Sequence, residues 1–207
     1  YTTLQIPKQG IGEWCHPLHT VDINDAGLRS SVQNGILNTE LGIPFRTPAE
    51  GHNVAFTSLW DNYPDSLEIP LKGKASRAYL LMAGSTNHMQ CHIDNGVIRI
   101  YYKDGTRDVM FLRNPDNWPP IEHIFFEDGL AFNRHTPALY RLRLKTGEIS
   151  NNFGEELGFP GASRELDGGA AVLLEMPLNP GKKLSHLVLE TLSNDVVIGL
   201  MGITLQR

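Results

Sequence analysis

The sequence contains little of what several common classes of protein require, beginning with cysteine. Only two cysteines occur in 207 residues, Cys15 and Cys91. They lie far apart, and neither belongs to a C-x-x-C pair, which excludes a zinc ribbon and a thioredoxin-type redox motif. Two cysteines are consistent either with one disulfide in an oxidising compartment or with two buried thiols. The sequence leaves both alternatives open.

Excess positive charge and long apolar runs are also absent. The chain contains 18 Lys and Arg against 23 Asp and Glu, so its net charge is −5. Nucleic acids and anionic membranes bind surfaces on which Lys and Arg cluster, and we expect neither as a partner. No apolar run approaches the roughly 18 residues that a transmembrane helix needs, so we expect no membrane span.

Helical periodicity is nearly absent, whereas strand patterns are frequent. Only residues 24–37 have a faint amphipathic rhythm, and Gly27 and Gly35 weaken it. Ten short segments, several of which alternate apolar and polar residues, are typical of strands separated by turns. The predicted strands are residues 54–60, 67–71, 77–83, 97–102, 108–112, 123–126, 138–144, 171–178, 184–192 and 196–205.

Turn signals connect these segments. The pair Asp104–Gly105 predicts a hairpin over residues 97–112 with a type I′ turn, in which both central residues need positive φ. Two further turns are predicted at residues 178–183 and 192–195. With 20 Gly and 13 Pro and no helix between strands, the pattern predicts an all-β fold, an antiparallel β-sandwich of the jelly-roll kind. No repeat or linker divides the chain, so we expect residues 1–207 to form a single domain.

Several segments follow one another in an order that is known from other proteins. They are "LGIPF" (41–45), "NVAFTS" (53–58), "IPLKGKASRAYLLMAGST" (69–86), "IYYKDGT" (100–106) and the run from 175 to 205. This order resembles the galactose-binding-like β-sandwich modules that accompany bacterial polysaccharide-degrading enzymes. The resemblance implies a non-catalytic carbohydrate-binding or accessory module of a glycoside hydrolase-type protein, in the periplasm or outside the cell. It implies a glycan or an adjacent catalytic domain as the partner.

Two alternatives remain beside glycan binding. The chain is then either a structural or interaction domain that braces a catalytic neighbour and has no ligand of its own, or a part of a glycoside hydrolase whose loops complete the active site. The first residue is Tyr1 rather than Met, as expected for a processed product or an excised part of a larger carbohydrate-active protein. All three interpretations need a larger parent protein.

Catalytic signatures are weak, and we assign no catalytic residue. The sequence has no G-x-S-x-G motif of the kind that presents a nucleophilic serine. A glycosidase needs two carboxyl groups at a fixed separation. The carboxylates in Gly- or Pro-bounded loops, which are Asp61, Asp65, Glu155 and Glu156, are expected to be solvated. We therefore do not expect the isolated domain to be an enzyme.

Metal ligation has two candidate sources. His16 and His19, and also His88 and His92, occur as close pairs, but the His-x-His pattern of cupin-type metalloenzymes is missing. We interpret these histidines as ordinary ones and leave a metal site unassigned. Oxygen-rich loops suit a structural calcium ion, or form turns with their own backbone. They contain Asp22, Asn24 and Asp25, and Asn114, Asp116 and Asn117.

A sugar site combines an aromatic face for the pyranose ring with planar polar groups for its hydroxyls. Four loops contain such residues: Trp60, Asp61, Asn62 and Tyr63; Asn117 and Trp118; Asn133, Arg134, His135 and Tyr140; and Asn87 and His88. Trp60 ends a predicted strand, a position that favours packing in the core. We therefore predict an exposed site centred on Trp118 and Arg134. Its predicted neighbours are Asn117, His135 and Tyr140, and the remaining candidates are Trp60, Asn62 and Tyr63.

Overall fold

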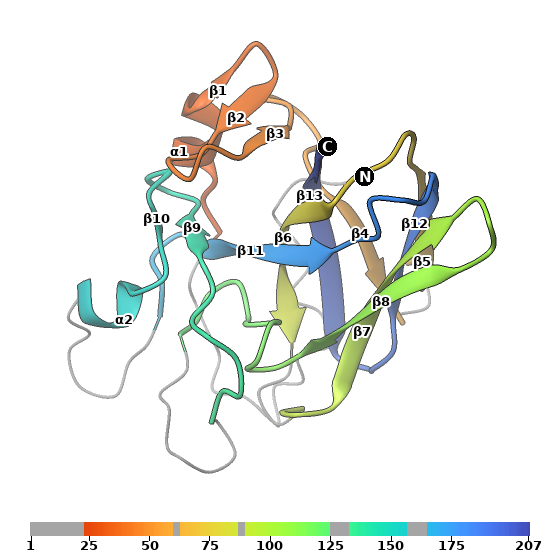
Figure 1. Ribbon diagram of the computed structural model, residues 1–207. Helices are drawn as coiled ribbons and strands as arrows, with labels where there is room; N and C mark the ends of the chain where they lie inside the picture. The colour runs from red at the N-terminus through yellow and green to blue at the C-terminus, as the bar shows by residue number, and fades with distance from the viewer. Residues whose placement is uncertain (1–22, 60–62, 87–89, 125–132, 157–164) are drawn as a thin grey trace.

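The computed structural model describes residues 23–59, 63–86, 90–124, 133–156 and 165–207. Two short helices and thirteen strands follow one another along these residues (Figure 1). The helices are α1 (Ala26–Ser30) and α2 (Phe153–Glu156). The strands are β1 (Val32–Gln33), β2 (Ile36–Asn38), β3 (Pro44–Arg46), β4 (Ala55–Ser58), β5 (Ser66–Pro70), β6 (Arg77–Thr86), β7 (Asp94–Tyr102), β8 (Arg107–Arg113), β9 (Arg141–Arg143), β10 (Ile149–Ser150), β11 (Ala170–Pro177), β12 (Leu184–Thr191) and β13 (Val196–Gln206).

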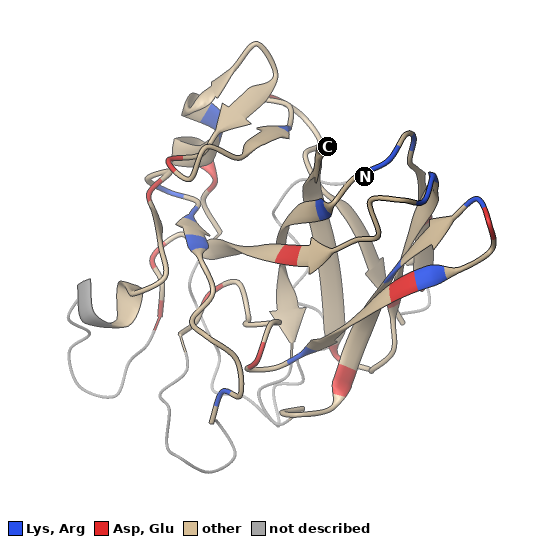
Figure 2. Cartoon of the chain, in the orientation of Figure 1, with Lys and Arg blue, Asp and Glu red and all other residues tan. Residues whose placement is uncertain are grey.

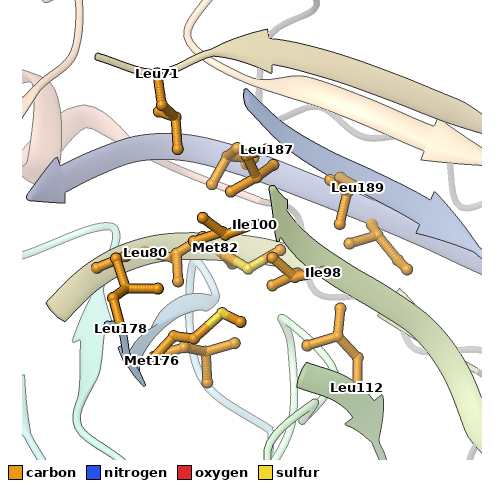
Figure 3. Packing of buried hydrophobic residues seen from close by; sticks show 14 of the residues in the cluster. Leu71, Leu80, Met82, Ile98, Ile100, Leu112, Met176, Leu178, Leu187 and Leu189 are labelled. Carbon is orange, nitrogen blue, oxygen red and sulfur yellow. The ribbon is translucent and has the colours of Figure 1, made fainter. Parts of the chain in front are cut away.

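Two antiparallel sheets pack face to face in the body of the molecule. The larger sheet has the strand order β10-β9-β11-β6-β13-β4, and the smaller has the order β5-β12-β7-β8. Alternate side chains of the two sheets meet between them, and the resulting apolar cluster includes Leu80 and Met82 of β6 and Ile98 and Ile100 of β7 (Figure 3). The prediction of an antiparallel β-sandwich is confirmed.

The six-stranded sheet is covered on its other face as well. There, Leu28 of α1 and Phe45 of β3 join a second apolar cluster with Leu81 of β6 and Leu173 of β11. The small sheet β1-β2-β3 therefore forms a third layer over part of the larger sheet. Because β6 is buried on both faces, its sequence is an almost continuous apolar run and does not alternate.

Nine of the ten predicted strands coincide with β4 to β9 and β11 to β13. The exception is the segment at residues 123–126. His123 forms only an isolated bridge with Glu165, and residues 125 and 126 lie outside the described part of the chain. The predicted turns at residues 178–183 and 192–195 are confirmed, since they connect β11 to β12 and β12 to β13.

The faintly helical stretch at residues 24–37 contains α1 but then forms a hairpin. Val32 and Gln33 pair with Leu37 and Ile36, which leaves Asn34 and Gly35 as a two-residue loop. Both loop residues have positive φ, +53° and +75°, as a type I′ turn requires. The faint helical rhythm therefore corresponds to a helix only over Ala26–Ser30, because the Asn-Gly pair favours a tight turn after it.

The hairpin over residues 97–112 is confirmed, but its predicted turn type is wrong. Gly105 has a φ of +84°, whereas neither Lys103 nor Asp104 has positive φ. The Gly105 N–H donates to the Tyr102 carbonyl (3.1 Å), and the Tyr102 N–H donates to the Thr106 carbonyl (2.9 Å). These bonds define a three-residue loop, a type I turn followed by a left-handed glycine. The Asp104 carboxylate explains the choice, because it accepts hydrogen bonds from the Thr106 hydroxyl (2.6 Å) and N–H (3.0 Å).

Basic and acidic residues are interspersed along the described chain (Figure 2). Ion pairs join Arg29 to Asp25 (2.8 Å), Lys145 to Asp167 (2.5 Å) and Lys182 to Asp104 (2.9 Å). Within the described residues, no helix is both long enough and apolar enough to cross a membrane.

Candidate functional site

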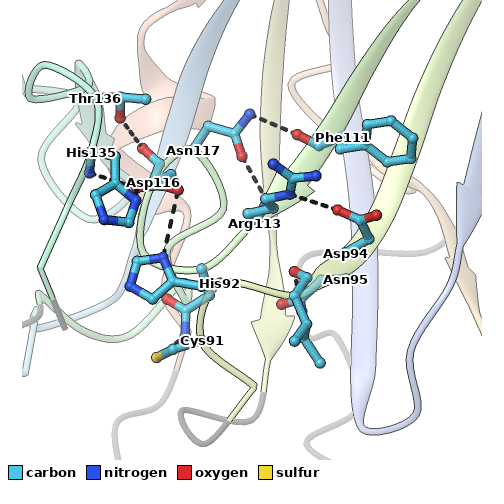
Figure 4. A network of polar contacts seen from close by, with 12 residues as sticks. Cys91, His92, Asp94, Asn95, Phe111, Arg113, Asp116, Asn117, His135 and Thr136 are labelled. Atoms are coloured by element: carbon cyan, nitrogen blue, oxygen red, sulfur yellow. Dashed lines mark hydrogen bonds and ion pairs between the residues drawn. The ribbon is translucent and has the colours of Figure 1, made fainter. Parts of the chain in front are cut away.

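The turn that follows β8 contains several of the predicted site residues. Its backbone is fixed by the N–H groups of Asn117 and Trp118, which both donate to the Arg113 carbonyl (3.0 and 3.1 Å). The Asn117 side chain accepts a hydrogen bond from the Arg113 N–H (2.8 Å) and donates one to the Phe111 carbonyl (2.9 Å). Asn117 therefore stabilises the turn with the same amide that was predicted to bind a sugar hydroxyl (Figure 4).

Trp118 is fully buried, and the prediction that it is exposed is wrong. Its ring belongs to the apolar cluster between the two sheets. The physical reason is a glycine on the facing strand β6. A Cβ atom on Gly84 would lie 2.7 Å from Cζ2 of Trp118, so only a residue without a side chain leaves room for the indole. The Ile121 N–H donates to the Gly84 carbonyl (2.8 Å) and holds the chain after the tryptophan against β6.

Asp116, in the same turn, has a side chain that is only 14% exposed, and it joins two other segments (Figure 4). One carboxylate oxygen lies 3.7 Å from Nδ1 of His92, and the other lies 3.5 Å from Nδ1 of His135. The two imidazole rings lie 4.5 Å apart between centroids, at 36° to each other. His92 follows β6 and precedes β7, whereas His135 belongs to the long connection between β8 and β9. The three side chains thus form one cluster, which we call the His-Asp-His cluster.

The connection that carries His135 is attached to this turn. The His135 N–H donates to the Asp116 carboxylate (2.7 Å), and the Thr136 hydroxyl donates to the Asp116 carbonyl (2.6 Å). The His135 side chain is 63% exposed, and Tyr140 is 38% exposed. The segment 133–140 also includes the half-buried Arg134. Two of its residues are held by hydrogen bonds to Asp116, and His135 and Tyr140 are exposed to solvent.

The chain that follows the Asp116 turn is held by a buried arginine that was not predicted from the sequence. Arg141 of β9 donates hydrogen bonds to the carbonyls of Pro120 (2.7 Å), His123 (2.5 Å) and Ala170 (3.0 Å). Burial lowers the pKa of the Arg141 guanidinium to about 10, and the charge of Glu122 acts in the opposite direction. The group stays protonated at neutral pH, so it can satisfy several carbonyls of a segment without regular secondary structure.

The remaining predicted site residues are not brought to this place by described contacts. Tyr63 packs against Phe56 of β4, with ring centroids 5.0 Å apart in an edge-to-face arrangement. Trp60 and Asn62 lie outside the described residues, as do Asn87 and His88. Cys15 also lies outside them, so the question of a bond to Cys91 stays open.

The first loop predicted for calcium uses its oxygens within the protein. Asp25 accepts hydrogen bonds from Arg29 (2.8 Å) and Asn53 (2.9 Å), and the Asn24 side chain accepts one from the Ala26 N–H (3.0 Å). The third predicted ligand, Asp22, lies outside the described residues. In the second loop, Asp116 faces two histidines, and the Asn114 amide donates to Sγ of Cys91 (3.5 Å). Calcium at either place stays a prediction.

A second, partly buried aromatic group lies on the outer face of the smaller sheet. Tyr101 of β7 stacks on His186 of β12, with centroids 4.6 Å apart and planes at 13°. The guanidinium of Arg107, on β8, lies 5.7 Å from the centre of the same tyrosine ring. Because β12 and β8 flank β7 on opposite sides, both faces of Tyr101 are covered. This group is less suited to stack on a sugar than Tyr140 is.

Each member of the His-Asp-His cluster was considered in the sequence analysis, but the three were not predicted to lie together. Asp116 was a calcium candidate, His135 a sugar-binding candidate and His92 an ordinary histidine. Their contacts join three segments that are distant along the chain, and no local spacing encodes them. Comparison with protein-family models, with curated proteins and with solved structures gives no match.

Proposed function

We propose that this chain is a non-catalytic module that binds glycan and accompanies a glycoside hydrolase-type protein in the periplasm or outside the cell. The observation that carries the proposal is the attachment of the segment 133–140 to the Asp116 turn, with His135 and Tyr140 exposed. The β-sandwich architecture and the resemblance to galactose-binding-like modules agree with this function.

Tyr140 takes the role that the sequence suggested for Trp118. An exposed phenol ring can cover the apolar side of a pyranose, and its hydroxyl can bond to the sugar. Arg134, His135 and Asn133 in the same segment supply planar polar groups. Because hydrogen bonds to Asp116 already order the start of the segment, less conformational entropy is lost when a ligand binds.

One observation favours the second candidate function, a domain that braces a catalytic neighbour. Strand β8 is an edge strand, and its outward residues Val109 and Phe111 are 42% and 41% exposed. Edge strands with exposed apolar side chains are common at contacts with other protein surfaces. The two functions are compatible, since the exposed side chains of β8 and the residues of the segment 133–140 are different sets.

A glycan array followed by calorimetry on the glycans that bind tests the proposed function. We expect Tyr140→Ala to weaken binding by about 1 to 3 kcal/mol, the scale of one lost aromatic contact. Phe111→Ala is the matched control, because this exposed aromatic lies on the outer face of β8, and it should bind as the parent does. A parent that binds no glycan, or binding that Tyr140→Ala leaves unchanged, would contradict the proposal. Loss of binding in the control alone would indicate that the glycan site lies on β8.

A further inference from the structure

We propose that His92, Asp116 and His135 bind one divalent transition-metal ion, with Zn²⁺ as the representative species. The ligand atoms of these three residues all lie within 4.8 Å of one another. The metal proposal does not rest on the proposed function, although His135 takes part in both, because the ion is expected to bind in the absence of any glycan.

The distances within the cluster fit ligands of a shared ion better than they fit hydrogen bonds. The two Nδ1-to-carboxylate distances, 3.7 Å for His92 and 3.5 Å for His135, are longer than a charge-assisted hydrogen bond of about 2.7 to 2.9 Å. Zinc lies about 2.0 to 2.2 Å from nitrogen and oxygen ligands, so two ligands at a tetrahedral angle are roughly 3.4 Å apart. A small shift of each side chain would bring both imidazoles and the carboxylate onto one ion.

His92 supplies a second observation. Both nitrogens of its ring are buried, and neither has a hydrogen-bond partner in the part of the chain that the structure describes. A buried polar atom without a partner costs free energy, and a bound ion would supply the partner for Nδ1. His92 also has a φ of +55°, which few residues adopt, and its N–H donates to the Asn114 carbonyl (2.7 Å). The backbone thus holds the imidazole beside Asp116 in an unusual conformation.

The carboxylate is oriented by its surroundings, as metal ligands usually are. Asp116 accepts the His135 N–H, and its carbonyl accepts the Thr136 hydroxyl. Such outer contacts fix the direction of a ligand before the ion arrives. Three protein ligands leave at least one coordination position for water or another molecule, and the exposure of His135 places that position near solvent.

The donor set selects the class of ion. Two imidazole nitrogens and one carboxylate suit zinc and its neighbours in the first transition series, whereas calcium takes six to eight oxygen ligands. Cys91 precedes His92, but it is not among the three residues whose ligand atoms converge, and its sulfur accepts a hydrogen bond from Asn114 (3.5 Å). The proposed site therefore contains nitrogen and oxygen ligands without a thiolate.

Calorimetric titration of the metal-free protein with Zn²⁺ alone, followed by the same titration of single variants, tests the proposal. The variants are His135→Ala, whose side chain is exposed, Asp116→Asn, which keeps an acceptor for the His135 N–H, and His92→Asn, which tolerates positive φ. We expect one ion per chain and a Kd at least about tenfold weaker in each variant, since loss of an outer contact alone costs 10- to 100-fold. His186→Ala on β12 is the matched histidine control and should bind as the parent does.

A cobalt spectrum separates ligand loss from unfolding. Co²⁺ bound to the parent should show visible absorption of a nitrogen and oxygen site without a sulfur charge-transfer band, and His135→Ala should change that spectrum while the circular dichroism stays the same. The proposal is overturned if the parent binds no Zn²⁺ in a saturable way. It is equally overturned if His135→Ala binds as tightly as His186→Ala, or if the cobalt spectrum shows a thiolate ligand.

Discussion

Asp116 and Trp118 belong to the same short turn, but their side chains point to opposite sides of it and have different partners. Trp118 packs between the sheets beside Gly84, whereas Asp116 contacts His92 and His135. Both residues come from one Asn-, Asp- and Pro-rich stretch that looks like a uniform loop. The two residues differ in the partners that the fold brings to them. Trp118 packs against Gly84 of β6, and Asp116 faces His92 and His135.

We infer that the buried side of the turn contributes to the stability of the fold and that its outer side contributes to ligand binding. Substitutions on the inner side should lower the free energy of unfolding, and substitutions on the outer side should change ligand binding with little effect on stability.

The largest effect is expected for Trp118→Ala. Removing a fully buried indole leaves a cavity, and such changes cost about 3 to 5 kcal/mol of unfolding free energy. Urea denaturation measures this directly. Phe111→Ala removes an aromatic ring that is 41% exposed and should change stability far less, because surface substitutions usually stay within about 0.5 kcal/mol. Similar losses in the two variants would contradict the prediction that the buried Trp118 contributes far more to stability than the exposed Phe111.

A medium effect is expected at the two glycine turns. Gly35 and Gly105 both have positive φ, and a Cβ on either would meet no atom within 4 Å. A valine there therefore costs only the backbone strain, about 1 to 2 kcal/mol. The thermal unfolding midpoints of Gly35→Val and Gly105→Val measure it.

The residues before these glycines distinguish the two turn types, because Asn34 has positive φ and Asp104 does not. Asn34→Gly should therefore leave the unfolding midpoint nearly unchanged, since glycine adopts positive φ freely. Asp104→Gly should lower it, because the φ there is not positive and the hydrogen bonds to Thr106 are lost. Equal effects would mean that the hairpin at Gly105 has the same turn type as the hairpin at Gly35.

The smallest effect is expected at Asp104 and depends on pH. Hydrogen bonds from the Thr106 hydroxyl and from Lys182 lower the pKa of the Asp104 carboxyl to about 2. Because the pKa in the folded state is depressed, the carboxylate contributes stability above its unfolded pKa of about 3.9, and this stability is lost as the pH falls toward 2.

Unfolding midpoints of the parent and of Asp104→Asn should therefore differ slightly at pH 7 and converge near pH 2. Asn keeps an acceptor for Thr106, so the variant isolates the charge. Glu40→Gln, another exposed carboxylate change, is the control and should show a smaller difference at pH 7. A gap that is unchanged between pH 7 and pH 2 would contradict the assigned cause.

The strands were predictable from sequence because their patterns are local. The alternation in residues 184–192 and the apolar run in residues 77–83 report the faces that each strand buries. The Asn34–Gly35 hairpin was also encoded locally, although a faint helical rhythm concealed it. The turn type at Gly105 was not predictable from the dipeptide, because hydrogen bonds of the Asp104 side chain decide it.

The candidate site was predictable only in part. His135 is exposed and lies in a loop, as predicted, and Tyr140 is exposed just before β9, although the predicted strand at residues 138–144 included it. The burial of Trp118 depends on Gly84, and the position of His92 depends on a backbone contact with Asn114. Neither contact is between neighbours in sequence, so neither could be inferred from the pattern of one chain.

The central claim is that the outer side of the Asp116 turn is a ligand site, and anomalous diffraction tests it most directly. Crystals of the protein grown with Zn²⁺ and measured on both sides of the zinc absorption edge locate any bound ion and identify it as zinc. We predict one anomalous peak within coordination distance, about 2.0 to 2.2 Å, of Nδ1 of His92, a carboxylate oxygen of Asp116 and Nδ1 of His135. An anomalous map without a peak between these three residues, while the crystals hold zinc elsewhere, would show that the three residues do not form a zinc site.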